Sequence, residues 1–280
     1  MAASSGPRTI LLTGAAGGLG TLMRELLPSH GYELRLLDVR PVDGAPDAIV
    51  ADLNDTEALR AAVRDVDGVL HLAGISLEST FDKILESNIR GTYHLFDSVR
   101  AEAERRGGPA PRVVFASSNH AIGFTPRPRV EDGDPLVPVS TLRRPDTYYG
   151  LSKSFGEDLA QFHWDKFGIE TVSVRIGSCF KEPTDVRMMS VWLSPADGAR
   201  LFHAALTAKD VGHTVVYGSS ANTRLWWDLS GARALGYDPQ DDSEVYADKL
   251  LAEFGPLSDD NPAHLHMGGR FVDDPPIWPY

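Results

Sequence analysis

A strand, a glycine-rich turn and a helix follow one another near the start of this chain, and this arrangement constrains the fold more than any other feature. Residues 9–13 form a short apolar run, typical of a buried strand, and residues 22–27 carry helical periodicity. Between them stand Gly14, Gly17 and Gly20. Glycines at this spacing allow a tight turn and close approach of the backbone to a pyrophosphate, and the helix N-terminus offers its amides to the phosphates. The segment predicts a dinucleotide-binding unit.

The following residues repeat the alternation of strand and helix. Strands are expected at residues 33–37, 48–53, 68–72, 112–116 and 170–175, and helices at residues 56–63, 81–100 and 149–167. This order predicts an α/β fold, a Rossmann-type doubly wound parallel sheet. Residues 124–146, which are rich in proline and charge, are expected to form a surface excursion.

We expect one structural domain with three parts. Residues 1–7 form a flexible N-terminus, residues 8–176 form the dinucleotide-binding Rossmann core including the helix at 149–167, and residues 177–280 form a smaller C-terminal cap that would cover a ligand at the edge of the sheet. The cap is expected to hold helices at residues 195–206 and 246–254, a short strand at 214–217, a helix opened by Trp226-Trp227-Asp228, and a tail at 267–271 in which one strand is possible.

Composition excludes several classes of partner. A net charge of -12 over 280 residues, without a basic run, argues against nucleic acid. No apolar run reaches the length of a membrane span, and the N-terminus has no apolar signal core, so no membrane association is expected. The single cysteine, Cys179, cannot form an internal disulfide or a cysteine-rich metal site, and it fits a reducing compartment. We expect a cytoplasmic protein.

Acidic and small residues after the next strands suit an adenosine dinucleotide. Asp38, about 20 residues past the glycine turn, can accept hydrogen bonds from a ribose and would repel a 2′-phosphate, which favours NAD over NADP. Arg40 nearby could soften that discrimination, and the aspartate could instead belong to an ordinary turn. Asp52 could present its side chain to the adenine ring. Asn88 is either a satisfied core polar group or a support for the catalytic lysine.

Tyr149 and Lys153 stand four residues apart, and so lie on one face of a helix. A phenol with a pKa near 10 is a poor base, but a neighbouring ammonium and the positive nicotinamide ring of an oxidised cofactor both favour the phenolate. Such a pair can take a proton from a sugar or alcohol hydroxyl while hydride leaves the same carbon. The pair alone is common on helix surfaces. Here the polar run Ser117-Ser118-Asn119-His120 ends a predicted strand, where parallel sheets bind ligands.

The glycine triplet, Asp38, Ser118 and the Tyr149/Lys153 pair together resemble the extended short-chain dehydrogenase/reductase superfamily. A finer resemblance is to the uronate dehydrogenases. It covers nearly the whole chain after Pro7 and is carried by residues 115–120 (FASSNH), 176–179 (IGSC), 187–188 (RM), 226–228 (WWD) and 269–273 (GRFVD). The chain departs from that family in an N-terminal extension and in a longer loop between residues 124 and 147.

This resemblance implies an NAD-dependent enzyme that oxidises D-glucuronate and D-galacturonate at C1 of the cyclic form. The product is the aldarolactone, which opens to the aldarate. Tyr149 would be the base, Lys153 would lower its pKa and hold the nicotinamide ribose, and Ser118 would hydrogen-bond the reacting oxygen. A homo-oligomer is also implied.

The resemblance also assigns the ligand contacts. Arg187 would bind the uronate carboxylate through two parallel hydrogen bonds. The sugar hydroxyls and the carboxylate would be held by Ser76, Asn119, His120 and Ser178. His120 could instead be a structural histidine. Besides Tyr149 and Lys153, the cofactor would contact Gly14, Gly17, Gly18, Leu19, Gly20, Asp38, Asp52, Leu53, Leu72, Ala73, Gly74, Asn88, Ile176 and Cys179. No metal is expected, because His264 and His266 lack ligand spacing, and Cys179 need not be a nucleophile.

Other functions remain open at this point. A sugar-nucleotide epimerase or dehydratase shares the superfamily motifs, although such relatives usually carry a larger C-terminal region. A dehydrogenase of another acidic sugar or of a lactone is a further alternative. A non-catalytic NAD-binding sensor belongs to another class, and such proteins commonly lose the tyrosine or the lysine, which are both present here.

Overall fold

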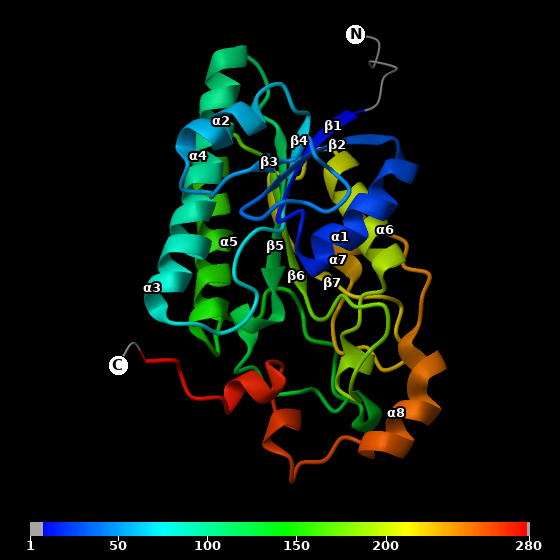
Figure 1. The fold of residues 1–280 in the computed structure, drawn as a ribbon. Coiled ribbons are helices and arrows are strands. Elements are labelled where there is room, and N and C mark those ends of the chain that lie inside the picture. Colours follow the sequence, from blue (N-terminus) through cyan, green and yellow to red (C-terminus); the bar gives the residue numbers. More distant parts are fainter. Residues whose placement is uncertain (1–7, 279–280) are drawn as a thin grey trace.

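A parallel sheet of seven strands forms the centre of the protein, with the strand order β3-β2-β1-β4-β5-β6-β7 (Figure 1). The structure is a computed structural model and describes residues 8–278, so the flexible segment expected at residues 1–7 lies outside the described residues. All six strand pairings are parallel. The predicted α/β, Rossmann-type fold is confirmed. The strands are β1 (Arg8–Thr13), β2 (Tyr32–Asp38), β3 (Ile49–Val50), β4 (Gly68–His71), β5 (Arg112–Ser118), β6 (Thr171–Ile176) and β7 (His213–Gly218).

Helices cover both faces of the sheet (Figure 1). One face carries α2 (Thr56–Val63), α4 (Gly91–Arg106) and α5 (Tyr148–Phe167), and the other carries α1 (Gly18–Leu26), α6 (Pro195–Thr207) and α7 (Ser230–Ala234). Successive strand residues point to opposite faces, so Leu11 joins the core under α2 and α4 while Leu12 joins the core under α1 and α6. No helix within residues 8–278 is both long enough and apolar enough to cross a membrane.

The chain beyond residue 177 completes the sheet as well as covering its edge. β7 pairs with β6 along its whole length, and α6 packs beside α1. The remaining segments, including α8 (Ala247–Phe254), lie below the carboxyl ends of the strands, where the red C-terminal segment crosses in Figure 1. The division at residue 177 stays a prediction, with the last strand of the sheet on its far side.

Three local predictions are wrong in whole or in part. The strand expected at residues 48–53 consists only of Ile49–Val50, and Asp52 lies in the turn that follows it. The helix expected before Gly236 is present as α7, but it begins at Ser230 and not at Trp226, and Trp227 is buried and stacks on Tyr217 at 4.8 Å. The tail forms a 3-10 helix at Gly269–Val272 instead of a strand.

The excursion at residues 124–146 is irregular apart from a short 3-10 turn, and a buried ion pair beside it fixes part of its path. Glu157 on α5 and Arg175 on β6 are both almost fully buried, with Nη2 of the arginine 2.8 Å from Oε2 of the glutamate. Arg175 Nη1 also donates to the carbonyl of Val139, at 3.0 Å. A buried pair of this kind is costly to break, because removal of one partner leaves an unpaired charge.

Candidate active site

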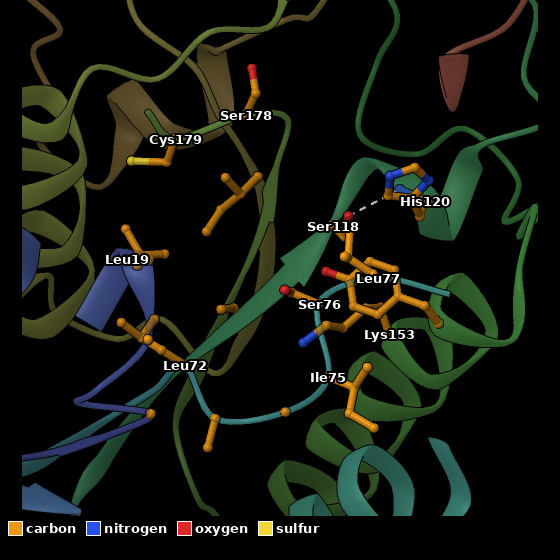
Figure 2. Close-up of a pocket in the computed structure, with 18 of the residues that line it drawn as sticks. Leu19, Leu72, Ile75, Ser76, Leu77, Ser118, His120, Lys153, Ser178 and Cys179 are labelled. Atoms are coloured by element: carbon orange, nitrogen blue, oxygen red, sulfur yellow. Dashed lines mark hydrogen bonds between the residues drawn. The ribbon is translucent and has the colours of Figure 1, made fainter. Parts of the chain in front are cut away.

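A cavity of about 870 Å³ lies at the carboxyl ends of the strands. We call one side of it the glycine end, which is lined by the turn Gly14–Gly20, by Asp38 and by Gly74. The other side is the tail end, lined by His120, Ser178, Arg187 and the segment 268–271. Figure 2 shows Leu19 and Leu72 at the glycine end, Ser118, His120 and Lys153 where β5 and α5 meet, and Ser178 across the cavity from Ser76.

The glycine end is built from backbone that approaches other backbone closely. Gly14 has a φ of +74°, and a Cβ atom there would lie 2.7 Å from the amide nitrogen of Ala73. A side chain at Gly20 would collide with the carbonyl of Gly14, whereas a Cβ at Gly18 would meet nothing within 4 Å. Gly17 is the N-cap of α1 and has no side chain that could accept a hydrogen bond. The amide N–H groups of the first helical turn therefore remain free to donate to a ligand. These features fit a pyrophosphate at the helix N-terminus.

Asp38 ends β2 and holds the glycine turn in place. Its carboxylate accepts hydrogen bonds from the amides of Ala16 and Arg40, each at 2.9 Å. A carboxylate has about four lone-pair sites, so both oxygens keep acceptor capacity toward the cavity. The arrangement fits a ribose with two free hydroxyls. Arg40 lies over the same carboxylate, with Nε 3.8 Å from Oδ1, and also lines the cavity.

Asn88 supports the loop after β4, and its predicted support of Lys153 stays a prediction. Its side-chain oxygen accepts from the amide of Ile75 at 2.8 Å, and its nitrogen donates to the Ile75 carbonyl at 2.9 Å and to Ser152 Oγ at 3.0 Å. Gly74 passes directly over this amide with a φ of +139°. Asn88 therefore fixes the loop that carries Ser76 and ties it to the helix that carries Tyr149. It is a satisfied polar group that does not itself line the cavity.

Tyr149, Lys153 and Ser118 converge at the middle of the cavity. Lys153 Nζ lies 5.4 Å from the centroid of the Tyr149 ring, and 5.0 Å from that of Phe115. Burial raises the pKa of Tyr149 to about 12, and the Ser118 hydroxyl opposes part of that rise. Burial lowers the pKa of Lys153 to about 8. The protein environment alone therefore keeps Tyr149 a phenol at neutral pH, and a charge supplied from within the cavity is needed to favour the phenolate.

Arg187 lies at the tail end, and the C-terminal segment holds it there. Its Nη1 donates to the carbonyl of Met267 at 2.9 Å, and a Cβ atom on Gly269 would lie 2.5 Å from its Nε. No carboxylate within residues 8–278 forms an ion pair with this guanidinium. Burial lowers the pKa of Arg187, against the opposing charges of Asp185 and Asp146. A partly buried guanidinium on the cavity wall, with donors to spare, fits a carboxylate ligand.

Ser178 and Asn119 differ in how they relate to this end. Ser178 lines the cavity, and its buried hydroxyl has no partner among residues 8–278, so it is available to a ligand. Asn119 is fully buried and does not line the cavity. Its amide donates to the same Met267 carbonyl that Arg187 uses, at 2.8 Å. Asn119 therefore ties the end of β5 to the tail, and its predicted contact with substrate stays a prediction.

The structure brings most of the predicted site residues to one cavity. All of the predicted cofactor and substrate residues except Asn88 and Asn119 line it. Sequence reasoning missed the cavity wall formed by Ala263, His264, Gly268, Arg270 and Phe271. The resemblance at residues 269–273 marked this tail as typical of a family but gave it no position. Sequence reasoning also missed Asp146, because no motif or periodicity around this residue indicates a functional role.

Comparisons with known proteins agree with this geometry. Residues 10–190 match the family described as the NAD dependent epimerase/dehydratase family. The chain is 49% identical over 272 residues to a uronate dehydrogenase of Pseudomonas syringae pv. tomato, with 96% of this chain and 94% of the relative covered. A crystal structure of glucuronic acid dehydrogenase from Chromohalobacter salexigens superposes with a TM-score of 0.87 at 43% identity, covering 96% of this chain and 97% of that one.

A mutant of uronate dehydrogenase from Agrobacterium tumefaciens, crystallised with NAD, also superposes with a TM-score of 0.87. It is 41% identical, and the match covers 97% of this chain and 99% of that one.

Proposed function

Because the chain belongs to the NAD dependent epimerase/dehydratase family and, within it, to the uronate dehydrogenases, we propose that it oxidises D-glucuronate and D-galacturonate at C1 of the cyclic form. The identity of 43–49% to uronate dehydrogenases over nearly the whole chain confirms the resemblance expected from the sequence, and the protein is an NAD-dependent oxidoreductase. The observation that carries the substrate proposal is Arg187, a partly buried guanidinium on the cavity wall at the opposite end from the glycine turn, without a carboxylate partner among residues 8–278. The product would be the aldarolactone.

The glycine end supplies the contacts for the cofactor. The amides at the start of α1 would bind the pyrophosphate, and Asp38 would accept hydrogen bonds from the adenosine ribose. Asp52 and Leu53 line the cavity beyond Asp38, where the adenine would lie. NAD, when bound, supplies the acceptor for the hydride that leaves C1 and a positive charge that favours the Tyr149 phenolate.

Three side chains would act on the C1 hydroxyl. Tyr149 takes its proton as the hydride leaves C1, and Ser118 donates a hydrogen bond to the same oxygen as that oxygen gains carbonyl character. Lys153 holds the nicotinamide ribose, and its charge favours the phenolate. All three residues are less than a tenth exposed, so little of their surface faces solvent outside the cavity.

The tail end would distinguish a uronate from a neutral sugar. Arg187 binds the carboxylate through two parallel charge-assisted hydrogen bonds, and the unpartnered hydroxyl of Ser178 lies at the same end. Ser76 and His120 would form hydrogen bonds with the sugar hydroxyls. A cytoplasmic location and a homo-oligomer remain proposals, the first supported by the single cysteine and the second by the family resemblance.

A substrate panel tests the proposal. Purified protein is mixed with NAD and, in separate samples, with glucuronate, galacturonate, glucose or UDP-glucose, and NADH absorbance is followed. Rapid NADH formation with both uronates and little with glucose is expected. Conversion of UDP-glucose without net NADH, together with inactivity on uronates, would assign the protein to the epimerases instead. NAD binding without any turnover would leave the non-catalytic sensor.

A further inference from the structure

One buried carboxylate beside the cavity is used by nothing in the mechanism above. Asp146 stands directly before Thr147, the N-cap of α5, and its side chain has no exposed surface. It fits into a cradle of glycines: a side chain at Gly123 or Gly268 would collide with Oδ2, and a Cβ atom on Gly150 would lie 3.0 Å from Oδ1. These glycines come from the turn after β5, the first turn of α5 and the tail.

The partner of this carboxylate is a residue of the cavity wall. Asp146 Oδ2 lies 2.7 Å from Nδ1 of His120, and the other oxygen accepts from the Thr147 hydroxyl at 2.9 Å. An ionised carboxylate only accepts hydrogen bonds, so Nδ1 of His120 must carry a hydrogen. Nε2 has no partner among residues 8–278, and in the neutral ring it is an acceptor.

The imidazole is held on its other sides as well. Its ring centroid lies 5.6 Å from that of Tyr149 and 4.4 Å from that of Phe271. Its backbone amide donates to Ser118 Oγ at 3.2 Å. The ring is therefore packed between the proposed base and the tail, with Nε2 as its one unused polar atom.

We propose that Asp146 is a positioning residue for uronate oxidation, which fixes the ring and tautomer of His120 so that Nε2 accepts a hydrogen bond from a sugar hydroxyl. Asp146 does not line the cavity, so any effect of its hydrogen bonds on the substrate is transmitted through His120. The inference rests on the proposed function, which assigns His120 to the sugar. It also gives the loop at residues 124–147 a task, since this loop ends by delivering Asp146 to the cradle.

A role in packing alone does not explain a charged group at this position. Asparagine has the same shape and would fill the cradle without a charge. The negative charge is also unfavourable for the proposed base. Burial is the larger cause of the raised pKa of Tyr149, and the charge of Asp146 raises this pKa further. An ionised acceptor is instead what fixes a histidine tautomer, since an amide can face Nδ1 with either its oxygen or its nitrogen.

A double-mutant cycle tests the proposal. Asp146→Asn, His120→Ala and the double variant are compared with the unmodified protein for glucuronate KM, kcat, NAD affinity and melting temperature. Asp146→Asn is expected to raise the KM for glucuronate up to about tenfold, the worth of one neutral hydrogen bond, and to leave NAD affinity within about twofold. In the His120→Ala background the same change should alter KM by less than about twofold.

Asp197→Asn is the matched control. The side chain of Asp197, on α6, is equally buried, and it accepts hydrogen bonds from two backbone amides away from the cavity. It should lower the melting temperature without changing the KM for glucuronate.

Three outcomes would overturn the inference. An equal rise in KM from Asp146→Asn with and without His120 would show that Asp146 does not act through that ring. An unchanged KM with a shifted pH profile of kcat would show that its charge acts on Tyr149 alone. Absence of uronate turnover by the unmodified protein would instead overturn the proposed function and this inference with it.

Discussion

The glycine end of the cavity is made of backbone, whereas the tail end is made of side chains. At the glycine end, the groups facing the cavity are helix amides and close-packed glycines, and the most important side chain, Asp38, is itself fixed by backbone amides. At the tail end, Arg187, His120 and Ser178 face the cavity from three different segments. Met267 holds Arg187 and Asp146 holds His120, whereas the Ser178 hydroxyl has no partner among residues 8–278.

The two ends also differ in how far apart in sequence their contacts lie. Ala16 and Asp38, which bond at the glycine end, are 22 residues apart. At the tail end, Arg187 reaches Met267 across 80 residues and Asn119 reaches it across 148. The difference teaches that the glycine turn and Asp38, which form the centre of the cofactor site, come from one strand–helix–strand unit, while substrate binding requires the last part of the chain to be docked.

The largest expected effect belongs to Tyr149, which stands where the two ends meet. Tyr149→Phe should lower kcat by roughly 100- to 10,000-fold, because the proton acceptor is lost while both ends stay intact. NAD affinity and the KM for glucuronate should change by less than about threefold. Steady-state NADH formation and NAD titration measure these quantities. Tyr148→Phe, one residue earlier, is the control and should leave kcat unchanged.

Arg187→Ala tests the tail end alone. Loss of the partner of a desolvated carboxylate should lower kcat/KM for glucuronate by about 30- to 1,000-fold. NAD affinity should not change, which isothermal titration can show. The exposed Arg233→Ala is the control for loss of a positive charge. Uronate turnover that survives Arg187→Ala intact would mean that the carboxylate binds elsewhere.

Asp38→Ala is the mirror test at the glycine end. We expect NAD to bind about tenfold to a hundredfold more weakly, because hydrogen bonds to an ionised acceptor are lost. NADP should be less affected, since the charge that repels a 2′-phosphate is removed. The KM for glucuronate at saturating NAD should stay the same. Asp43→Ala, at an exposed position in the following loop, serves as comparison.

Gly269→Ala should give the smallest effect and tests whether the tail positions Arg187. Gly269 has a φ of +61°, and its new Cβ would press on the guanidinium. We expect about a tenfold rise in the KM for glucuronate. Gly107→Ala is the control, because Gly107 has a φ of +62° with nothing within 4 Å of a Cβ atom. It should cost similar stability without changing KM.

The parts of the fold that could be predicted are those in which local pattern and tertiary contact agree. The helix at residues 56–63 has the predicted bounds, because its apolar spacing and its Asp55 cap both lie within one short stretch. The serines of β5 were expected just beyond the strand, but the strand runs on to Ser118 because β6 pairs with it that far. The start of α7 was misplaced for a related reason: Trp227 stacks on Tyr217 of β7, and the helix begins only at Ser230.

The sequence by itself determined the sheet, the glycine end and the pairing of Tyr149 with Lys153. Each of these rests on periodicity or on spacing within about one strand–helix unit. Such patterns can be recognised locally, without knowledge of the contacts that the rest of the chain makes. Tertiary structure alone decided that Asp146 would meet His120, that Asn119 would turn to Met267, and that the tail would hold Arg187. Two of these contacts join segments that are distant in the chain, and the third depends on glycines from three segments, so no local pattern encodes them.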